Sequence, residues 1–183
     1  MGFMNLKEAA AKYVSEPMRS NMAQLINFDV YHCLLAGSLD TSLEVQEEYP
    51  GFPQEYIEWV QICDGGLLFD TTLLSTRNYD GKLKLRFETY DEYNDSETYL
   101  AYGIPEGYEV FGFYGYGPLL CFNVQKKDGK VYVWDYEFGK FSEEWSTFGE
   151  WMADAIANGI RLIEDGVFDP LGIKVSRGDS DVN

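Results

Sequence analysis

The single histidine of this chain, His32, lies directly before Cys33. Imidazole and thiol are a pair that can perform nucleophilic catalysis when the ring activates the sulfur. Adjacency in the sequence is not evidence for such a dyad, and both residues belong to the apolar run "MAQLINFDVYHCLLAG". We therefore interpret His32 as a hydrogen-bonded structural histidine rather than a catalytic base.

The motifs of the chain do not indicate a metal or phosphate site. There is no second histidine, no C-x-x-C pair and no D-x-[DN]-x-[DN]-G calcium loop. The stretch "GFYGYG" lacks the G-K-[ST] ending of a phosphate-binding loop, and no helix start follows it. Cys33, Cys63 and Cys121 are odd in number and have apolar neighbours, so we expect buried thiols. We predict no metal and no cofactor.

Carboxylates are the other abundant reactive groups, and two of them could act together as the acid and base of a glycoside hydrolase. Nothing in their spacing singles out a pair, so a solvated acidic face is the preferred interpretation. The segment "DYEFGKFSEEW" resembles an acid–base cluster, but its aromatic residues favour packing at a strand end and turn. We predict no enzymatic activity, and a carboxylate-dependent glycoside hydrolase stays the enzyme alternative.

The charge balance is the strongest global feature. The chain has 31 acidic and 14 basic residues, which gives a formal net charge of −17. No Lys or Arg occurs between Arg19 and Arg77, and none occurs between Phe87 and Gln125. Such a field repels nucleic acid and anionic membranes and attracts a basic protein. We therefore expect a basic protein partner and no direct binding of nucleic acid or membrane.

An acidic, tyrosine-rich segment in the second of these stretches is the predicted partner-binding site. Its local charge is not neutralised by Lys or Arg, and tyrosine side chains offer large contact areas with few rotatable bonds. The predicted site residues are Asp91, Glu92, Tyr93, Asp95, Glu97 and Tyr99. A solvated loop or helix face is the alternative for this segment. The acidic surface around Glu44, Glu47 and Glu48 is the next candidate.

The stretch "YPGFPQEYIEWVQICDGG", residues 49–66, predicts a short amphipathic helix that leads into a strand. Pro53 suits the first helical turn. Tyr56, Trp59, Val60 and Cys63 have the spacing of one apolar stripe, and the first three should face the core. The two glycines that follow Asp64 give the backbone the conformational freedom to end the helix.

The other elements complete a helical N-terminal layer, a central antiparallel sheet and a returning helix. The final helix should start at Thr147, form a capping box with Glu150 and end at Asn158-Gly159. The other predicted helical segments are a helix over 6–15, a helix or strand over 22–37, a short acidic helix or turn over 42–51, and a helix ending near 103. The predicted strands cover 67–75, 108–117, 118–125 and 130–137, and hairpin turns are expected at 80–81 and 127–130.

These elements predict a single domain of the α+β class with a mostly antiparallel sheet. We divide the chain into an N-terminal helical extension (1–41), an α+β core (42–159) and a C-terminal extension with a mobile tail (160–183). No apolar run is long enough to span a membrane, and the N-terminus lacks the pattern of a signal peptide. The expected location is the cytoplasm, where buried thiols stay reduced.

Five motifs in this order resemble the SUKH superfamily, which includes bacterial immunity proteins and fungal regulators of cell-wall assembly. They are "GFPQEYIEW", the Gly65-Gly66 pair, "EVFGFYGYGPLLCFNV", "GKVYVWDYEFGK" and "STFGEWM". Together they cover about residues 42–156. The chain departs from the usual pattern at Asp64, where the family has Asn, and in the segments before residue 42 and after Gly159.

The resemblance implies a binding module rather than an enzyme. Bacterial members of this kind neutralise a cognate polymorphic toxin, frequently a nuclease, by binding it in the cytoplasm. A nuclease needs a basic surface to hold phosphates, so an acidic protein is complementary to it. The expected function is therefore toxin immunity, and a non-catalytic regulatory or scaffold protein is the alternative.

Overall fold

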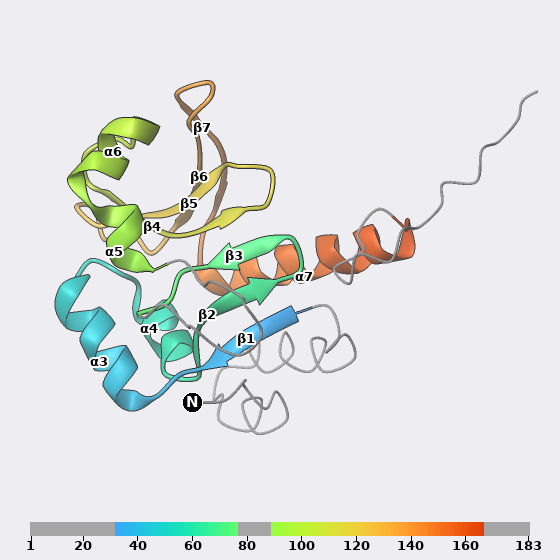
Figure 1. Cartoon of the computed structure of the whole chain (residues 1–183), viewed down its shortest axis with the longest axis horizontal. Coiled ribbons are helices and arrows are strands. Elements are labelled where there is room, and N and C mark those ends of the chain that lie inside the picture. Colours follow the sequence, from blue (N-terminus) through green and yellow to red (C-terminus); the bar gives the residue numbers. More distant parts are fainter. Residues whose placement is uncertain (1–31, 77–88, 167–183) are drawn as a thin grey trace, which may run out of the picture.

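The computed structural model describes residues 32–76 and 89–166. Its seven strands form one antiparallel sheet, in which each strand pairs with its neighbours in the sequence (Figure 1). The strands are β1 (His32–Ala36), β2 (Cys63–Leu68), β3 (Thr71–Leu73), β4 (Tyr108–Tyr114), β5 (Leu119–Asn123), β6 (Val131–Asp135) and β7 (Lys140–Trp145). This arrangement confirms the predicted α+β class with an antiparallel sheet.

Helices join the strands and cover the sheet. They are α3 (Leu39–Glu48), α4 (Gln54–Val60), α5 (Tyr90–Asn94), α6 (Ser96–Tyr102) and α7 (Phe148–Glu164). Helix α4 contacts β2 and α7, whereas α5 contacts β4 (Figure 1). None of the helices in the described ranges is both long and apolar enough to cross a bilayer.

The core is a cluster of aromatic rings contributed by α4, β4, β5 and α7. Tyr56 lies 4.9 Å from Phe148 between ring centroids, and Phe111 lies 4.2 Å from Phe122 and 5.5 Å from Trp151. All five side chains are buried. Each large aromatic ring removes much apolar surface from water, and edge-on and offset contacts between rings add to that gain. These five rings thus join helices α4 and α7 to the sheet.

Helix α4 has its predicted apolar stripe but ends earlier than the sequence suggests. Tyr56, Trp59 and Val60 are buried, as predicted. Pro53 is the N-cap residue rather than part of the first turn, and the last helical residue is Val60. Cys63 therefore belongs to β2 and not to the helix, although it is buried.

The Gly65-Gly66 pair also lies within β2, so the prediction that it ends the helix is wrong. A Cβ atom on Gly65 would come within 2.4 Å of the Leu74 carbonyl oxygen, and its φ is +77°. Only glycine fits such a close backbone approach at a positive φ. The preceding Asp64 is buried and accepts hydrogen bonds of 2.9 Å from both the amide and the hydroxyl of Thr76.

The segment 67–75 is not one strand, because a turn at Phe69-Asp70 separates β2 from β3. Strand β7 was not predicted, since the aromatic residues of this segment were assigned to packing at a strand end and turn. The hairpin turn at 127–130 is confirmed between β5 and β6, with Gly129 at a φ of +74°. The acidic segment forms two short helices, α5 and α6, and Gly103 ends the second in a left-handed conformation as expected.

Helix α7 begins at its predicted N-cap but is longer than predicted. The Thr147 hydroxyl accepts a hydrogen bond from the Glu150 amide, while the Glu150 carboxylate accepts one from Ser146. Gly159 does not end the helix, which continues to Glu164. A Cβ atom at this glycine would lie 2.3 Å from the ring of Phe69, so Gly159 provides space for the β2–β3 turn.

Some predictions concern parts of the chain that the structure does not describe. The helix over 6–15, the hairpin turn at 80–81 and the mobile tail lie outside the described residues, and so do the side chains of His32 and Cys33. In the apolar segment 22–37, residues 32–36 form strand β1. The acidic segment 42–51 is largely the helix α3. The division of the chain at residues 41 and 159 stays a prediction.

Candidate partner-binding surface

Two carboxylates of the predicted binding segment hold the starts of its two short helices. The Glu92 carboxylate accepts a 2.9 Å hydrogen bond from the amide of Thr89, which completes a capping box at α5. Asp95 is the N-cap of α6, where one carboxylate oxygen accepts bonds of 2.7 and 2.9 Å from the amides of Glu97 and Thr98. Hydrogen bonds from Thr98 and Glu97 hold the pKa of Asp95 below its usual value. Both carboxylates are thus engaged within the fold.

The two tyrosines of the segment fix these helices to the sheet. The ring of Tyr93 stacks on Phe113 of β4 at 5.0 Å between centroids and lies parallel to Tyr102. The hydroxyl of Tyr99 donates a hydrogen bond to the backbone carbonyl of Tyr108. Both tyrosines are half-buried, so they offer less contact area to a partner than the sequence suggests.

Asp91 and Glu97 are the predicted site residues that point most freely to solvent. Asp91 is exposed in the first turn of α5 and accepts a 3.4 Å hydrogen bond from Tyr49. Glu97 is exposed in the first turn of α6. The segment therefore contains four residues engaged within the fold, together with Asp91, which is exposed and also bonds to Tyr49, and Glu97, whose exposed side chain has no hydrogen bond among the described residues.

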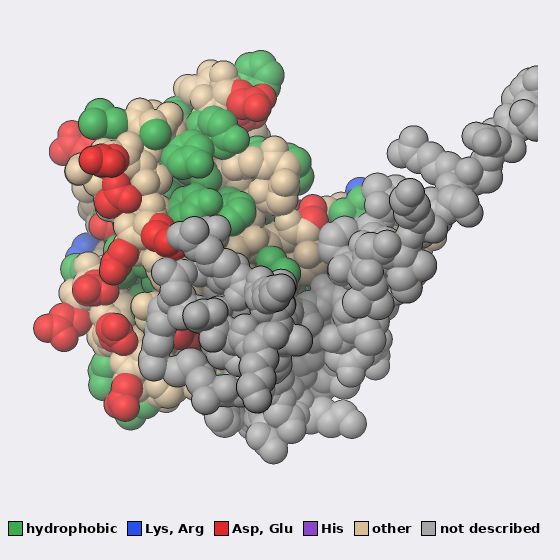
Figure 2. Space-filling view, in the orientation of Figure 1, with side chains coloured by type: hydrophobic (Ala, Val, Ile, Leu, Met, Phe, Trp, Pro, Cys, Tyr) green, Lys and Arg blue, Asp and Glu red, His purple; other side chains and the backbone are tan. Residues whose placement is uncertain are grey.

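Asp91 belongs to a larger group of carboxylates that includes the end of α3. Partial burial and the charges of Asp91, Glu44 and Glu47 together raise the pKa of Glu48. We call Glu44, Glu47, Glu48 and Asp91 the acidic face. Figure 2 shows acidic side chains gathered over the part of the surface that α3 and α5 form. Like charges remain close together here because all four side chains are exposed to water.

From the sequence alone, the segment at 91–99 and the group at Glu44, Glu47 and Glu48 are alternative surfaces. The fold places Asp91 of the first beside Glu48 of the second. No local pattern signals this, because the two positions are far apart in the chain and meet only when α5 returns beside α3.

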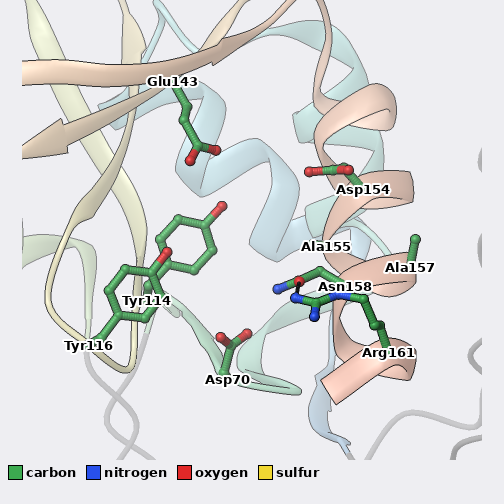
Figure 3. A pocket seen from close by; sticks show the side chains of 9 residues that line it. All are labelled: Asp70, Tyr114, Tyr116, Glu143, Asp154, Ala155, Ala157, Asn158 and Arg161. Atoms are coloured by element: carbon green, nitrogen blue, oxygen red, sulfur yellow. Dashed lines mark hydrogen bonds between the residues drawn. The ribbon is translucent and has the colours of Figure 1, made fainter. Parts of the chain in front are cut away.

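A polar cavity of about 440 Å³ lies on another part of the molecule, between β7, α7 and the β2–β3 turn (Figure 3). Glu143 and Asp154 approach it from opposite walls, while Asp70 lies beside the stacked rings of Tyr114 and Tyr116. Burial raises the pKa of Asp70. Three carboxylates line this cavity, so it is where a carboxylate-dependent hydrolase would find its catalytic pair.

The arginine at this cavity is engaged with other partners. Arg161 at its edge bonds to Asn158 and Asp165 rather than to one of the lining carboxylates. Within residues 32–76 and 89–166, no group of three His, Cys, Asp or Glu residues has a geometry that could hold a metal ion. The two described cysteines, Cys63 and Cys121, are buried, and burial raises the pKa of both thiols, so neither is an activated nucleophile.

A more apolar groove of about 730 Å³ runs between α6 and the adjoining ends of β4 and β5. Leu100, Tyr108 and Val124 are among the residues that line it, and the side chain of Leu100 is 85% exposed. Glu109 also lines it, and burial raises the pKa of its carboxyl group. Neither Leu100 nor Glu109 is among the site residues predicted from the sequence. The one local signal was a leucine among the polar residues of "SETYLAY".

Comparison with known proteins identifies one family. The model of the SMI1 / KNR4 family (SUKH-1) matches residues 38–154, which is more than half of the chain. No curated protein and no solved structure gives a significant match. The matched region runs from the N-cap of α3 into α7 and includes both the acidic face and the groove.

Proposed function

Because the chain belongs to the SMI1 / KNR4 family (SUKH-1), we propose that it is an immunity protein, which neutralises a basic bacterial toxin by binding it through the acidic face. The main observation behind this proposal is that α3 and α5 lie side by side and together form one acidic surface. The toxin would be a polymorphic toxin domain, such as a nuclease, encountered in the cytoplasm. The protein itself would perform no catalysis.

Electrostatic complementarity supports this function in two ways. A net charge of −17 attracts a basic domain over distances of about a Debye length and increases the rate of association. A nuclease presents basic side chains to the phosphates of its substrate, so a carboxylate surface can occupy the same side chains. Occupying that surface excludes the nucleic acid, and the toxin is neutralised without any reaction.

The proposal is tested with a candidate toxin domain, ideally the product of a neighbouring gene, by measuring association kinetics. Glu44→Gln, Glu47→Gln and Asp91→Asn are combined in one variant, which leaves the helix-capping residues Glu92 and Asp95 in place. The control combines three exposed carboxylates elsewhere that have no hydrogen bond among the described residues, Glu58→Gln, Glu137→Gln and Glu164→Gln. Both variants carry the same net charge.

We expect the acidic-face variant to associate about tenfold more slowly at low salt, and the control to change much less. High salt should weaken the wild-type complex by screening. If both variants slow association equally, the acidic face is not the interface. If the wild-type protein binds no basic toxin domain, the immunity proposal fails.

A regulatory or scaffold role is the second candidate, because the matching family model is not restricted to immunity proteins. Genomic context separates the two functions. A toxin reading frame next to the gene favours immunity, whereas an isolated gene favours regulation of endogenous partners. Steady turnover on a panel of glycosides or nucleotides, lost in Asp154→Asn or Glu143→Gln, would contradict both and identify the polar cavity as an active site.

A further inference from the structure

The groove beside α6 combines an apolar wall with a carboxylate that lacks a partner. One carboxylate oxygen of Glu109, Oε2, is removed from solvent and accepts no hydrogen bond from any of the described residues. The apolar wall includes Val124 and the exposed side chain of Leu100. A carboxylate that is partly removed from water and has an oxygen without a hydrogen bond is costly to keep charged. Because Glu109 also lines the groove, a cation that enters the groove beside this carboxylate offsets part of that cost.

The acidic face and the groove act on the same tyrosine. Burial is the largest cause of the raised pKa of Tyr49, and the charges of Asp91 and Glu109 both add to it. Tyr49 bonds to Asp91 of the acidic face, and Glu109 lines the groove. A basic partner held at α3 and α5 is therefore attracted toward the groove as well.

We propose that this groove receives an arginine side chain of the basic partner, with Glu109 as the receptor for its guanidinium group and Leu100 as an apolar contact beside it. The inference deepens the proposed function and rests on it, since it names one anchoring contact of the same interface. It adds two residues, Leu100 and Glu109, to the predicted site.

Arginine fits this groove better than other occupants. Its guanidinium group is less strongly hydrated than an ammonium group, so it loses less on leaving water to contact a half-buried carboxylate. Its aliphatic stem can cover apolar surface such as Leu100 and Val124, and its flat head can stack on a ring such as Tyr108. An apolar side chain would cover the Glu109 carboxylate without supplying a positive charge or a donor. Arginine is also enriched among the residues that dominate binding energy at interfaces.

The test uses a blocked amino acid, N-acetyl-arginine amide, titrated into ¹⁵N-labelled full-length protein and followed by NMR. N-acetyl-citrulline amide is the neutral control ligand of the same shape. We expect saturable shifts of the amides of Leu100, Gly107, Glu109 and Val124 with the arginine compound and none with citrulline. Glu109→Gln should weaken the binding about tenfold, because it removes the charge of the acceptor.

Two further variants make the result specific. Glu106→Gln removes an equal charge from an exposed position nearby and should leave the affinity unchanged. Leu100→Ala, at an exposed position where the fold does not depend on the side chain, should weaken binding two- to threefold, as expected for about half a kilocalorie of lost contact.

Shifts that spread over α3 and α5 and survive in Glu109→Gln would overturn the inference, as would equal binding of citrulline. Either result would leave the proposed function intact, because that function is judged by association with a toxin domain. Conversely, arginine binding in the groove together with no toxin binding would contradict immunity and not the arginine site.

Discussion

The hydroxyl group of Tyr49 donates a 3.4 Å hydrogen bond to a carboxylate oxygen of Asp91. Tyr49 is the C-cap residue of α3, and Asp91 lies in the first turn of α5. The tyrosine ring stacks on Phe52 at 5.1 Å, which holds the hydroxyl in place. Burial and the negative charges of Asp91 and Glu48 raise the pKa of Tyr49 well above its usual value, so the hydroxyl remains a donor at neutral pH. This contact joins two helices that the sequence alone presents as separate.

We predict that Tyr49→Phe lowers the free energy of unfolding by about 0.5–1.5 kcal/mol, the usual net value of one hydrogen bond. The phenylalanine ring keeps the stacking on Phe52, so the loss should come from the hydroxyl alone. Urea denaturation followed by circular dichroism measures it. Tyr102→Phe is the matched control, because its hydroxyl has no hydrogen bond among the described residues, and it should be neutral. Equal losses in both variants would show that the Tyr49–Asp91 bond contributes nothing.

We predict a clear difference between two neighbouring acidic residues of the predicted binding segment. Asp95→Ala removes the N-cap of α6 and should lower the midpoint of urea denaturation, whereas Glu97→Ala in the first turn should leave it almost unchanged. The same pair of variants, measured against a toxin domain, would separate folding from binding. If Asp95→Ala and Glu97→Ala denature at the same midpoint, Asp95 does not stabilise the helix and is again a candidate interface residue.

Asp95 also illustrates how much of the site the sequence can predict. The pattern correctly indicated an acidic, tyrosine-rich helical segment that ends at Gly103. It could not distinguish a carboxylate that caps a helix from one that is free, because Asp is favoured both at N-caps and on solvated faces. Glu109 is harder still, since the groove that it lines is built from α6 and the ends of β4 and β5, which are separate in the sequence.

The fold was predictable where local chemistry decides the structure. The stripe of Tyr56, Trp59 and Val60 and the turn at Gly129 follow from spacing and backbone freedom. Glycines were misread where tertiary packing sets their role. Gly65 meets the backbone of Leu74, and Gly159 meets the ring of Phe69, so each is required by a residue distant in the sequence. A glycine that ends a helix and one that allows close packing are identical in the sequence.

We predict that Trp59→Ala lowers the free energy of unfolding by about 3–5 kcal/mol, as expected for truncating a fully buried tryptophan. Trp59 has no exposed surface and lies 6.0 Å from Phe148 between ring centroids, so it joins α4 to α7. Thermal or urea denaturation measures the loss. A variant that melts within a degree or two of the wild-type protein would mean that this side chain is exposed in solution and available as a binding anchor.

The carboxyl group of Glu109 should make the protein less stable as the pH rises. Burial raises its pKa in the folded state above the ordinary value of 4.5. Between 4.5 and the higher folded value, the folded protein binds more protons than the unfolded chain, so stability falls with increasing pH. Glu109→Gln has no such titration. The variant should therefore gain stability relative to the wild-type protein between about pH 4 and about pH 7.

Urea denaturation of both proteins at the two pH values measures this difference. Asp70 and Glu48 also have raised pKa values, but they titrate in both proteins and cancel in the comparison. Burial, and to a smaller extent the charge of Glu109, raises the pKa values of Tyr49 and Tyr99, so both remain protonated throughout this range. Glu106→Gln, at an exposed position, should show no pH-dependent gain. A pH-independent difference between Glu109→Gln and the wild-type protein would show that Glu109 is solvated when no partner is bound, and would remove the physical reason for an arginine in the groove.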